Sequence, residues 1–147
     1  MAMTMTGEVQ LPADRETVWQ KLNDAEVLKA CIPGCEELNK TSDTQFQAVA
    51  TQKIGPVKAT FNGEVTLSNI NPPAGYTISG EGKGGVAGFA KGGATVALAD
   101  KDGGTLLTYN VEAQIGGKLA QLGQRLVNGA AKKLADDFFA KFAAAVK

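Results

Sequence analysis

The sequence predicts an α+β protein in which a strongly curved antiparallel sheet wraps around one long C-terminal helix. Two patterns support this fold class. The hydrophobic period is two from residue 36 to residue 116, and it becomes helical from residue 118 to residue 146. A chain of 147 residues can bury a core without disulfides or a structural metal, so we expect residues 1–147 to form a single domain.

An opening strand, "TMTGEVQL", is expected to lead into two short helices. Asp14 is suited to cap the first, "DRETVWQKLND", by accepting a hydrogen bond from the Thr17 amide. Asp24 can cap the second, "AEVLKAC". This helix must end before Pro33, because the residue that precedes a proline avoids the helical region.

The segment from residue 36 to residue 116 reads as an antiparallel meander. In "VKATFNGEVTLS" and "TLLTYNVEAQI" apolar residues alternate with polar ones, so each strand has one dry and one wet face. The turn signals between strands are Thr41-Ser42-Asp43, Ile54-Gly55-Pro56, Asn71-Pro72-Pro73-Ala74-Gly75 and Lys101-Asp102-Gly103-Gly104.

Residues 118–146 are predicted to form one helix of about 43 Å that lies along the sheet. The apolar stripe shifts around the helix between its first and second halves, so the two halves should touch different parts of the protein. The first half is marked by Leu119, Leu122, Leu126, Ala130 and Leu134, and the second by Phe138, Phe139, Phe142 and Val146.

The inside of this sheet is short of large side chains. Its inward positions include Ala48, Ala50, Ala59, Gly63 and Ala113, and the facing helix offers Gly123 and Ala130. Ringed by Phe46, Phe61, Tyr109 and Leu126, such a surface would leave an apolar hollow of the kind that holds ligands. Alternatively, the small residues let the helix dock tightly on the sheet.

The glycine-dense tract 79–94, "SGEGKGGVAGFAKGGA", is not a phosphate-binding loop, because no helix follows it. It reads either as a mobile hairpin at a cavity mouth with Phe89 at its tip, or as a twisted or bulged edge hairpin that needs glycine geometrically.

Composition excludes several function classes. The chain has no histidine, which removes the usual general base and the commonest zinc ligand. Cys31 and Cys35 are separated by three residues rather than two and have no partner cluster, so we expect buried thiols and no metal site. No carboxylate constellation stands out, and we expect no catalytic residue.

Charge argues against nucleic acid as a partner, since 15 basic residues balance 15 acidic ones. The charge is unevenly placed, however. Residues 118–147 carry six basic and two acidic residues, so the remainder of this neutral chain carries a net charge of −4. The basic helix could orient the protein on an anionic membrane or an acidic partner, or it could be an ordinary solvated face. Without a signal peptide or an apolar run of membrane-spanning length, the chain is expected to be cytoplasmic.

Several segments, in this order, resemble the CoxG family, which is named for a component of carbon monoxide dehydrogenase and belongs to the START-like, helix-grip superfamily (SRPBCC). They are "CIPGCEEL", "KIGPVKATFNGEVTL", "GEGKGGVAGFAKGGATVAL" and "GGKLAQLGQRLVNGAAKKLADDFF". The resemblance runs from about residue 4 to about residue 146. It implies a seven-stranded antiparallel sheet that grips the C-terminal helix around an apolar cavity, in one START-like ligand-binding domain.

The resemblance also implies a function. Family members are encoded with molybdenum hydroxylases such as aerobic carbon monoxide dehydrogenase, and are thought to help attach the enzyme to the membrane or pass its electrons there. We therefore expect a non-enzymatic accessory protein, peripheral on the inner face of the cytoplasmic membrane, with a quinone or lipid as its ligand and no covalently bound cofactor. The alternatives are a cyclase or hydratase of the same fold, for which Tyr76 and Tyr109 would be inspected first, and a purely structural assembly factor.

The residues expected to line the cavity are Ile32, Phe46, Ala59, Phe61, Gly63, Phe89, Val96, Leu98, Tyr109, Leu119, Leu122, Leu126 and Ala130. Those expected to contact a membrane or partner are Phe89, Lys118, Arg125, Lys132 and Lys133. Some members continue into an apolar or amphipathic tail, and without one this contact would depend on the glycine hairpin and the basic helix face.

Overall fold

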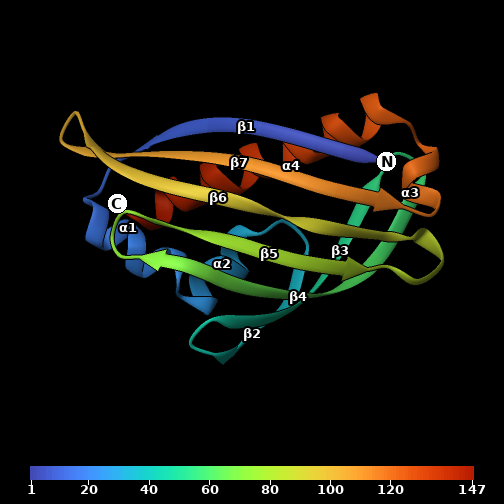
Figure 1. The fold of residues 1–147 in the computed structure, drawn as a ribbon, viewed down its shortest axis with the longest axis horizontal. Coiled ribbons are helices and arrows are strands. Elements are labelled where there is room, and N and C mark those ends of the chain that lie inside the picture. The colour runs from blue at the N-terminus through green and yellow to red at the C-terminus, as the bar shows by residue number, and fades with distance from the viewer.

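In the computed structural model, which describes residues 1–147, seven strands form one antiparallel sheet that curves around a long helix (Figure 1). The elements in chain order are β1 (Ala2–Leu11), α1 (Arg15–Leu22), α2 (Ala25–Cys31), β2 (Cys35–Ser42), β3 (Gln45–Ile54), β4 (Val57–Asn71), β5 (Gly75–Lys83), the 3-10 turn η1 (Gly85–Ala87), β6 (Phe89–Lys101), β7 (Gly104–Gly116), α3 (Lys118–Gln121) and α4 (Gln124–Ala145). The strand order is β1-β7-β6-β5-β4-β3-β2. The predicted fold class is confirmed.

The two short helices begin at the predicted caps. The Thr17 amide donates to Asp14 Oδ1 over 2.9 Å, and the amides of Glu26 and Val27 donate to Asp24 Oδ1 over 3.0 and 3.4 Å. These hydrogen bonds satisfy first-turn donors that have no partner within the helix. The Thr17 hydrogen bonds also lower the pKa of the Asp14 carboxyl, because they favour its charged form.

The corner between α2 and β2 forms as its sequence requires. The helix ends at Cys31, ahead of Pro33, and Gly34 has a φ of +73°. A side chain at Gly34 would collide with the Thr51 carbonyl oxygen, so this turn needs glycine both for its backbone angle and for close approach. The turn brings α2 against β2 and places Cys35 at the first position of that strand.

The long C-terminal helix differs from the prediction in one respect. It is divided at Gly123, whose φ of +91° cannot belong to a right-handed α-helix. The short α3 therefore precedes the 22-residue α4. Because the break resets the rotation of α4, Val127 is buried at 6% exposure whereas Leu126, expected on the apolar stripe, is 40% exposed.

The glycine tract needs glycine geometrically, as one expectation held, since side chains at Gly88, Gly92 and Gly93 would collide with backbone atoms, but it is not an edge hairpin and Phe89 is not at its tip. Its strands, β5 and β6, lie in the middle of the sheet rather than at an edge. The apolar side chain exposed in the connection between them is Val86, with 84% exposure, whereas Phe89 is 41% exposed at the start of β6. The ring of Phe89 occupies the space that a side chain at Gly116 would need.

Side chains between the sheet and the helices form two clusters of unequal size. The larger has 11 buried residues and lies around the second half of α4, where Phe142 is completely buried. The smaller has only four, which are Met3, Ile115, Leu119 and Val127. The two halves of the C-terminal helical region therefore contact different parts of the protein, as predicted, and the end around α3 and the start of α4 holds less buried side-chain volume.

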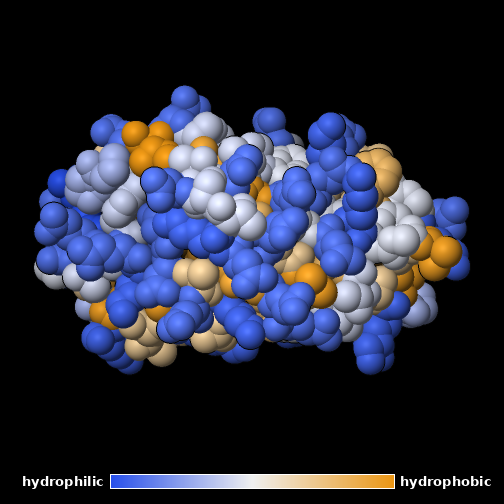
Figure 2. All heavy atoms as spheres, turned by 90° about the horizontal axis from the view of Figure 1, so that it is seen from below, coloured by the Kyte–Doolittle hydropathy of each residue, from blue (hydrophilic) through white to orange (hydrophobic).

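Hydrophilic residues cover much of the face shown in Figure 2, and hydrophobic residues show between them in several separate places, one of which is the end of the molecule that carries α3 and η1. The large hydrophobic side chains that are exposed are Ile70, Val86, Phe89 and Leu126. None of the helices combines the length and the apolar character needed to cross a membrane.

Candidate functional site

The inner face of the sheet, which packs on α4, loses its large side chains toward the end that carries α3. Residues paired across neighbouring strands share a face, so the register defines rows. One row runs across β7, β6, β5, β4 and β3 as Ile115, Ala90, Gly82, Gly63 and Ala48. Every residue that follows Ile115 in this row is alanine or glycine. At Ala90 and Gly82 this row leaves space above the sheet.

The next row toward the middle of the sheet is also rich in small residues, although a side chain at Gly92 or Gly80 would meet the backbone of a neighbouring strand. It contains Met3, Ala113, Gly92, Gly80 and Val65. Farther along, the rows carry large residues, as where Leu107 pairs with Leu98 and Tyr109 with Val96. The sheet is consequently filled at one end and open at the other.

A hollow of about 280 Å³ occupies the open end, between the sheet and the helices α3 and α4. Its lining consists of Met3, Gln52, Ile54, Phe61, Gly82, Ala90, Ala113, Ile115, Leu119, Val127, Ala130, Ala131 and Leu134. Eleven of these 13 residues are hydrophobic, and none is ionisable. Because water gains few hydrogen bonds in such a lining, the hollow is suited to an apolar guest.

Gln52 supplies the one polar side chain of the hollow. Its Nε2 donates to the Pro33 carbonyl oxygen over 2.7 Å, which holds the side chain against the corner between α2 and β2. Its Oε1 accepts no hydrogen bond from another protein group and is not a buried, unsatisfied atom. The part of Gln52 that lines the hollow is therefore its apolar stem, and no polar side-chain atom faces the hollow.

A surface groove of about 660 Å³ adjoins the hollow. Both are lined by Gln52, Ile54, Ala130 and Leu134, so the groove lies where the hollow meets the surface between β3 and α4. The groove is further lined by Pro33, Lys53, Gly55, Arg125, Leu126, Gly129, Lys133 and Asp137. A molecule that reaches the hollow through this groove would pass charged side chains first.

The chain matches, over residues 7–147, the family model that describes CoxG, the G component of carbon monoxide dehydrogenase. It belongs to the CoxG family. A conserved protein from Geobacillus kaustophilus is 34% identical and has a similar structure, with a TM-score of 0.92 over 98% of this chain and 95% of that one. No curated protein matches the chain.

More distant structures share the helix-grip fold with this CoxG-family protein. The protein Ara h 8.0201 is 12% identical, with a TM-score of 0.70 over 99% of this chain and 98% of that one. The Zhui aromatase/cyclase from Streptomyces sp. R1128 is 11% identical, with a TM-score of 0.68 over 99% and 94%. At these identities the likeness establishes the fold alone.

The structure brings together only part of the predicted lining of the CoxG-family cavity. Phe61, Leu119 and Ala130 line the hollow, and Leu126 lines the groove. Leu122 packs beside the smaller cluster that borders the hollow. The predicted residues that lie elsewhere are Ile32, Phe46, Ala59, Gly63, Phe89, Val96, Leu98 and Tyr109.

Three physical reasons explain six of these displaced predictions. Phe46, Leu98, Val96 and Tyr109 belong to the larger cluster, because the aromatic second half of α4 fills that end of the sheet. For example, Phe139 stacks on Tyr109 with 5.2 Å between ring centroids. Ile32 caps the end of α2, outside the hollow. Gly63 leaves little free space, since an added Cβ would lie 3.3 Å from the Glu81 carbonyl oxygen.

Sequence reasoning missed Gly82 and Ala90, which form part of the floor of the hollow, and Gln52 at its edge. The alternation of glycine and alanine through β5 and β6 could have indicated the first two, had those strands been placed at the centre of the sheet. Nothing in the sequence indicated that Gln52 lies at the hollow. A single polar residue at an inward strand position is equally expected where the end of a strand is exposed to solvent.

The residues expected to contact a membrane or partner do not form one surface in this CoxG-family protein. Arg125 and Lys133 line the groove, whereas Lys132 forms an ion pair with Asp136 over 3.0 Å and does not line it. Lys118 begins α3, at the same end as the connection between β5 and β6.

The two tyrosines lie away from the hollow. Tyr76 packs edge-on against Trp19 with 5.2 Å between ring centroids, and burial raises the pKa of its hydroxyl well above the ordinary value of 10.0. The Tyr109 hydroxyl fills the space beside Gly7. Neither hydroxyl is placed to act on a molecule in the hollow.

Both cysteines are free. Cys31 is buried as predicted, whereas Cys35 is half-buried, because it begins a strand at the edge of the sheet. Burial raises the pKa of both thiols, so thiolate, the reactive form, is scarce near neutral pH.

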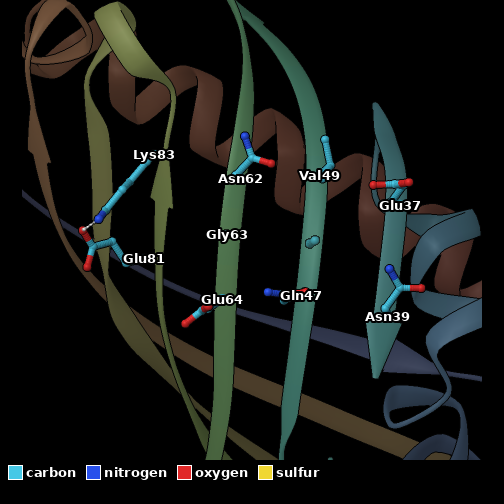
Figure 3. A pocket seen from close by; sticks show the side chains of 10 residues that line it. Glu37, Asn39, Gln47, Val49, Asn62, Gly63, Glu64, Glu81 and Lys83 are labelled. Atoms are coloured by element: carbon cyan, nitrogen blue, oxygen red, sulfur yellow. Dashed lines mark ion pairs between the residues drawn. The ribbon is translucent and has the colours of Figure 1, made fainter. Parts of the chain in front are cut away.

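A polar depression of about 520 Å³ lies on the opposite, outer face of the sheet (Figure 3). Glu37, Glu64 and Glu81 line it together with Lys83, whose Nζ lies 3.9 Å from Glu81 Oε1, and α4 runs behind the sheet in this view. No three Cys, Asp or Glu side chains are grouped to hold a metal ion. The residues that line this depression lie on the solvent-exposed faces of their strands.

Proposed function

We propose that this protein binds a lipophilic small molecule, a quinone or a lipid, in the hollow. We further propose that it serves as a non-enzymatic accessory of a molybdenum hydroxylase such as carbon monoxide dehydrogenase, peripheral on the inner face of the cytoplasmic membrane. The family name points to association with carbon monoxide dehydrogenase. The observation that carries the binding proposal is an apolar hollow of about 280 Å³ without an ionisable side chain.

The volume agrees with this class of ligand. An engineered cavity of about 150 Å³ in another protein holds one benzene ring. A hollow of about 280 Å³ therefore has room for roughly a fused two-ring system, or about ten carbons of an alkyl chain. A ligand larger than this would extend into the groove, which leads to the surface.

The lining favours binding over catalysis. A cyclase or hydratase needs a positioned acid or base at the reacting atom. The hollow presents no polar side-chain atom, since Gln52 lines it with its apolar stem only, and the proposal is therefore of a carrier rather than an enzyme.

Titration of the purified protein with menadione, a naphthoquinone without a tail, and with decanol tests the proposal by calorimetry. One equivalent of either is expected to bind. The variant Gly82→Leu should prevent binding, since an added Cβ at Gly82 meets no atom within 4 Å and so projects into free space. Native mass spectrometry of protein that has been incubated with membranes and purified again provides a second test. The binding proposal fails if neither compound binds and no quinone or lipid is found on this protein.

The same variant separates a carrier from a structural assembly factor. A carrier with a blocked hollow should still associate with its hydroxylase but should no longer support electron delivery. An assembly factor should support its partner equally well with the hollow blocked.

A further inference from the structure

One side of α4 presents two adjacent rows to the groove. Leu126, Ala130 and Leu134 are spaced four apart and form an apolar row, of which the last two also line the hollow. Arg125, Gly129, Lys133 and Asp137 are also spaced four apart, and every one of them lines the groove. Residues with this spacing lie above one another on one helix face. The groove therefore has an apolar strip that continues into the hollow and a charged strip beside it.

Two residues of the charged strip are unfavourable choices for the helix itself. Arg125 stands in the first turn of α4, where a positive charge opposes the helix dipole, and no acidic residue accompanies it there. Gly129 lies in the interior of α4, where glycine weakens a helix relative to alanine. Locally unfavourable residues that share one surface indicate a function for that surface.

Gly129 opens a gap between the two cations of the strip. A Cβ built at Gly129 meets no atom within 4 Å, so the helix surface between Arg125 and Lys133 is bare. Arg125 forms no ion pair, and Lys133 pairs with Asp137 over 2.7 Å. Lys53 adds a further positive charge at the opposite side of the groove.

We propose that, of the two ligand classes named above, the hollow takes the lipid: an amphiphile whose apolar part fills the hollow and whose anionic end group, a carboxylate or a phosphate, lies over Gly129 between Arg125 and Lys133. This inference rests on the proposed function of the hollow, and it adds the charge and the position of the polar end. Cations beside an apolar wall attract an anion while the attached chain leaves water.

Three ten-carbon probes with different end groups test the preference by calorimetry at pH 7 and low salt. They are decanoate, decanol and decylammonium, each below its micelle concentration. Decanoate is expected to bind most tightly and decylammonium least tightly. The advantage of decanoate over decanol should shrink at 0.5 M NaCl, because screening weakens exposed charge interactions.

Variants along the charged strip should change decanoate affinity in opposite directions. Arg125→Gln should weaken decanoate binding by about two- to fivefold, the range expected for the loss of an exposed ion pair, and should leave decanol binding unchanged. Asp137→Asn should tighten decanoate, because it removes the acid and frees Lys133. Lys101→Gln, at the last position of β6, removes one positive charge outside the groove and should change the binding of neither probe.

Gly129→Gln gives a readout that a purely structural role would not produce. Glutamine is a good helix former and fills the gap without a charge, so the variant should melt at a higher temperature and yet bind decanoate more weakly than the wild type. Decanol affinity should remain within twofold.

The inference is overturned if decylammonium binds as tightly as decanoate, or if Arg125→Gln and Gly129→Gln change decanoate and decanol by the same factor. Binding of decanol in either case would leave the proposed function of the hollow standing. Failure of all three probes to bind would instead count against that function.

Discussion

Replacing Gly82 by leucine should make the protein more stable while abolishing ligand binding. Gly82 lies in a central strand on the floor of the hollow, its φ is not positive, and an added Cβ meets no atom within 4 Å. Most large substitutions in a packed interior are destabilising because they force neighbouring atoms apart. Here the added side chain should enter space that is empty of protein.

The size of the gain follows from the volume filled. A leucine side chain adds four carbons, which on the scale of six carbons in a cavity of about 150 Å³ occupy roughly 100 Å³. At about 24 cal/mol per Å³ of cavity, complete filling would stabilise the protein by about 2.4 kcal/mol. Because the hollow meets the surface at the groove, we expect about half of this, or roughly 1 kcal/mol, which corresponds to an increase of about 2–4 °C in Tm.

Urea denaturation followed by circular dichroism measures the change in the free energy of unfolding, and calorimetry with menadione measures binding. Ala140→Leu serves as the control. It places the same leucine side chain on an exposed face of α4 and should change the free energy of unfolding by no more than about 0.5 kcal/mol. The reasoning is refuted if Gly82→Leu lowers the free energy of unfolding by more than about 1 kcal/mol and still binds menadione with wild-type affinity.

Three further predictions concern the packed end of the molecule and its corner. Phe142→Ala should destabilise the protein by about 3–5 kcal/mol in urea denaturation, because this ring is completely buried; a loss below about 1 kcal/mol would contradict the packing. Burial raises the pKa of Tyr76 above its ordinary 10.0, so the unfolded state ionises first, and stability should fall as pH rises above about 10, with a flatter profile for Tyr76→Phe. The double variant Cys31→Ala, Cys35→Ala should keep menadione affinity, and a loss in a variant that remains folded would assign the thiols a role.

Local sequence chemistry was sufficient to predict most of the architecture. Asp14 and Asp24 cap helices, Pro33 ends one, and strict alternation marks β4 and β7, because each of these effects acts within a few residues along the chain. The break at Gly123 was missed because a glycine inside a helical pattern is compatible both with a continuous helix and with a positive φ.

The sequence was sufficient to predict that an apolar hollow exists, but not where in the sheet it lies. Small residues on inward strand positions indicated unfilled space, yet its position depends on which rows the register aligns. Ile115, Ala90 and Gly82 come from three strands, and only their pairing puts them side by side. Which end remains open also depends on α4, since its break decides whether Val127 or Leu126 faces the sheet.

The strand order has a consequence for how the chain acquires its structure. β1 occupies one edge of the sheet and pairs only with β7, with Ala2 opposite Gln114, so the first strand made must wait for almost the last. Contacts so distant in sequence slow folding, because a long loop must close before they form. During synthesis the hairpins from β2 to β7 can assemble in order as they emerge, whereas β1 stays unpaired until residue 114 is available. We therefore expect the hollow to be completed in the final step of folding, since Met3 of β1 and Val127 of α4 both form part of its wall.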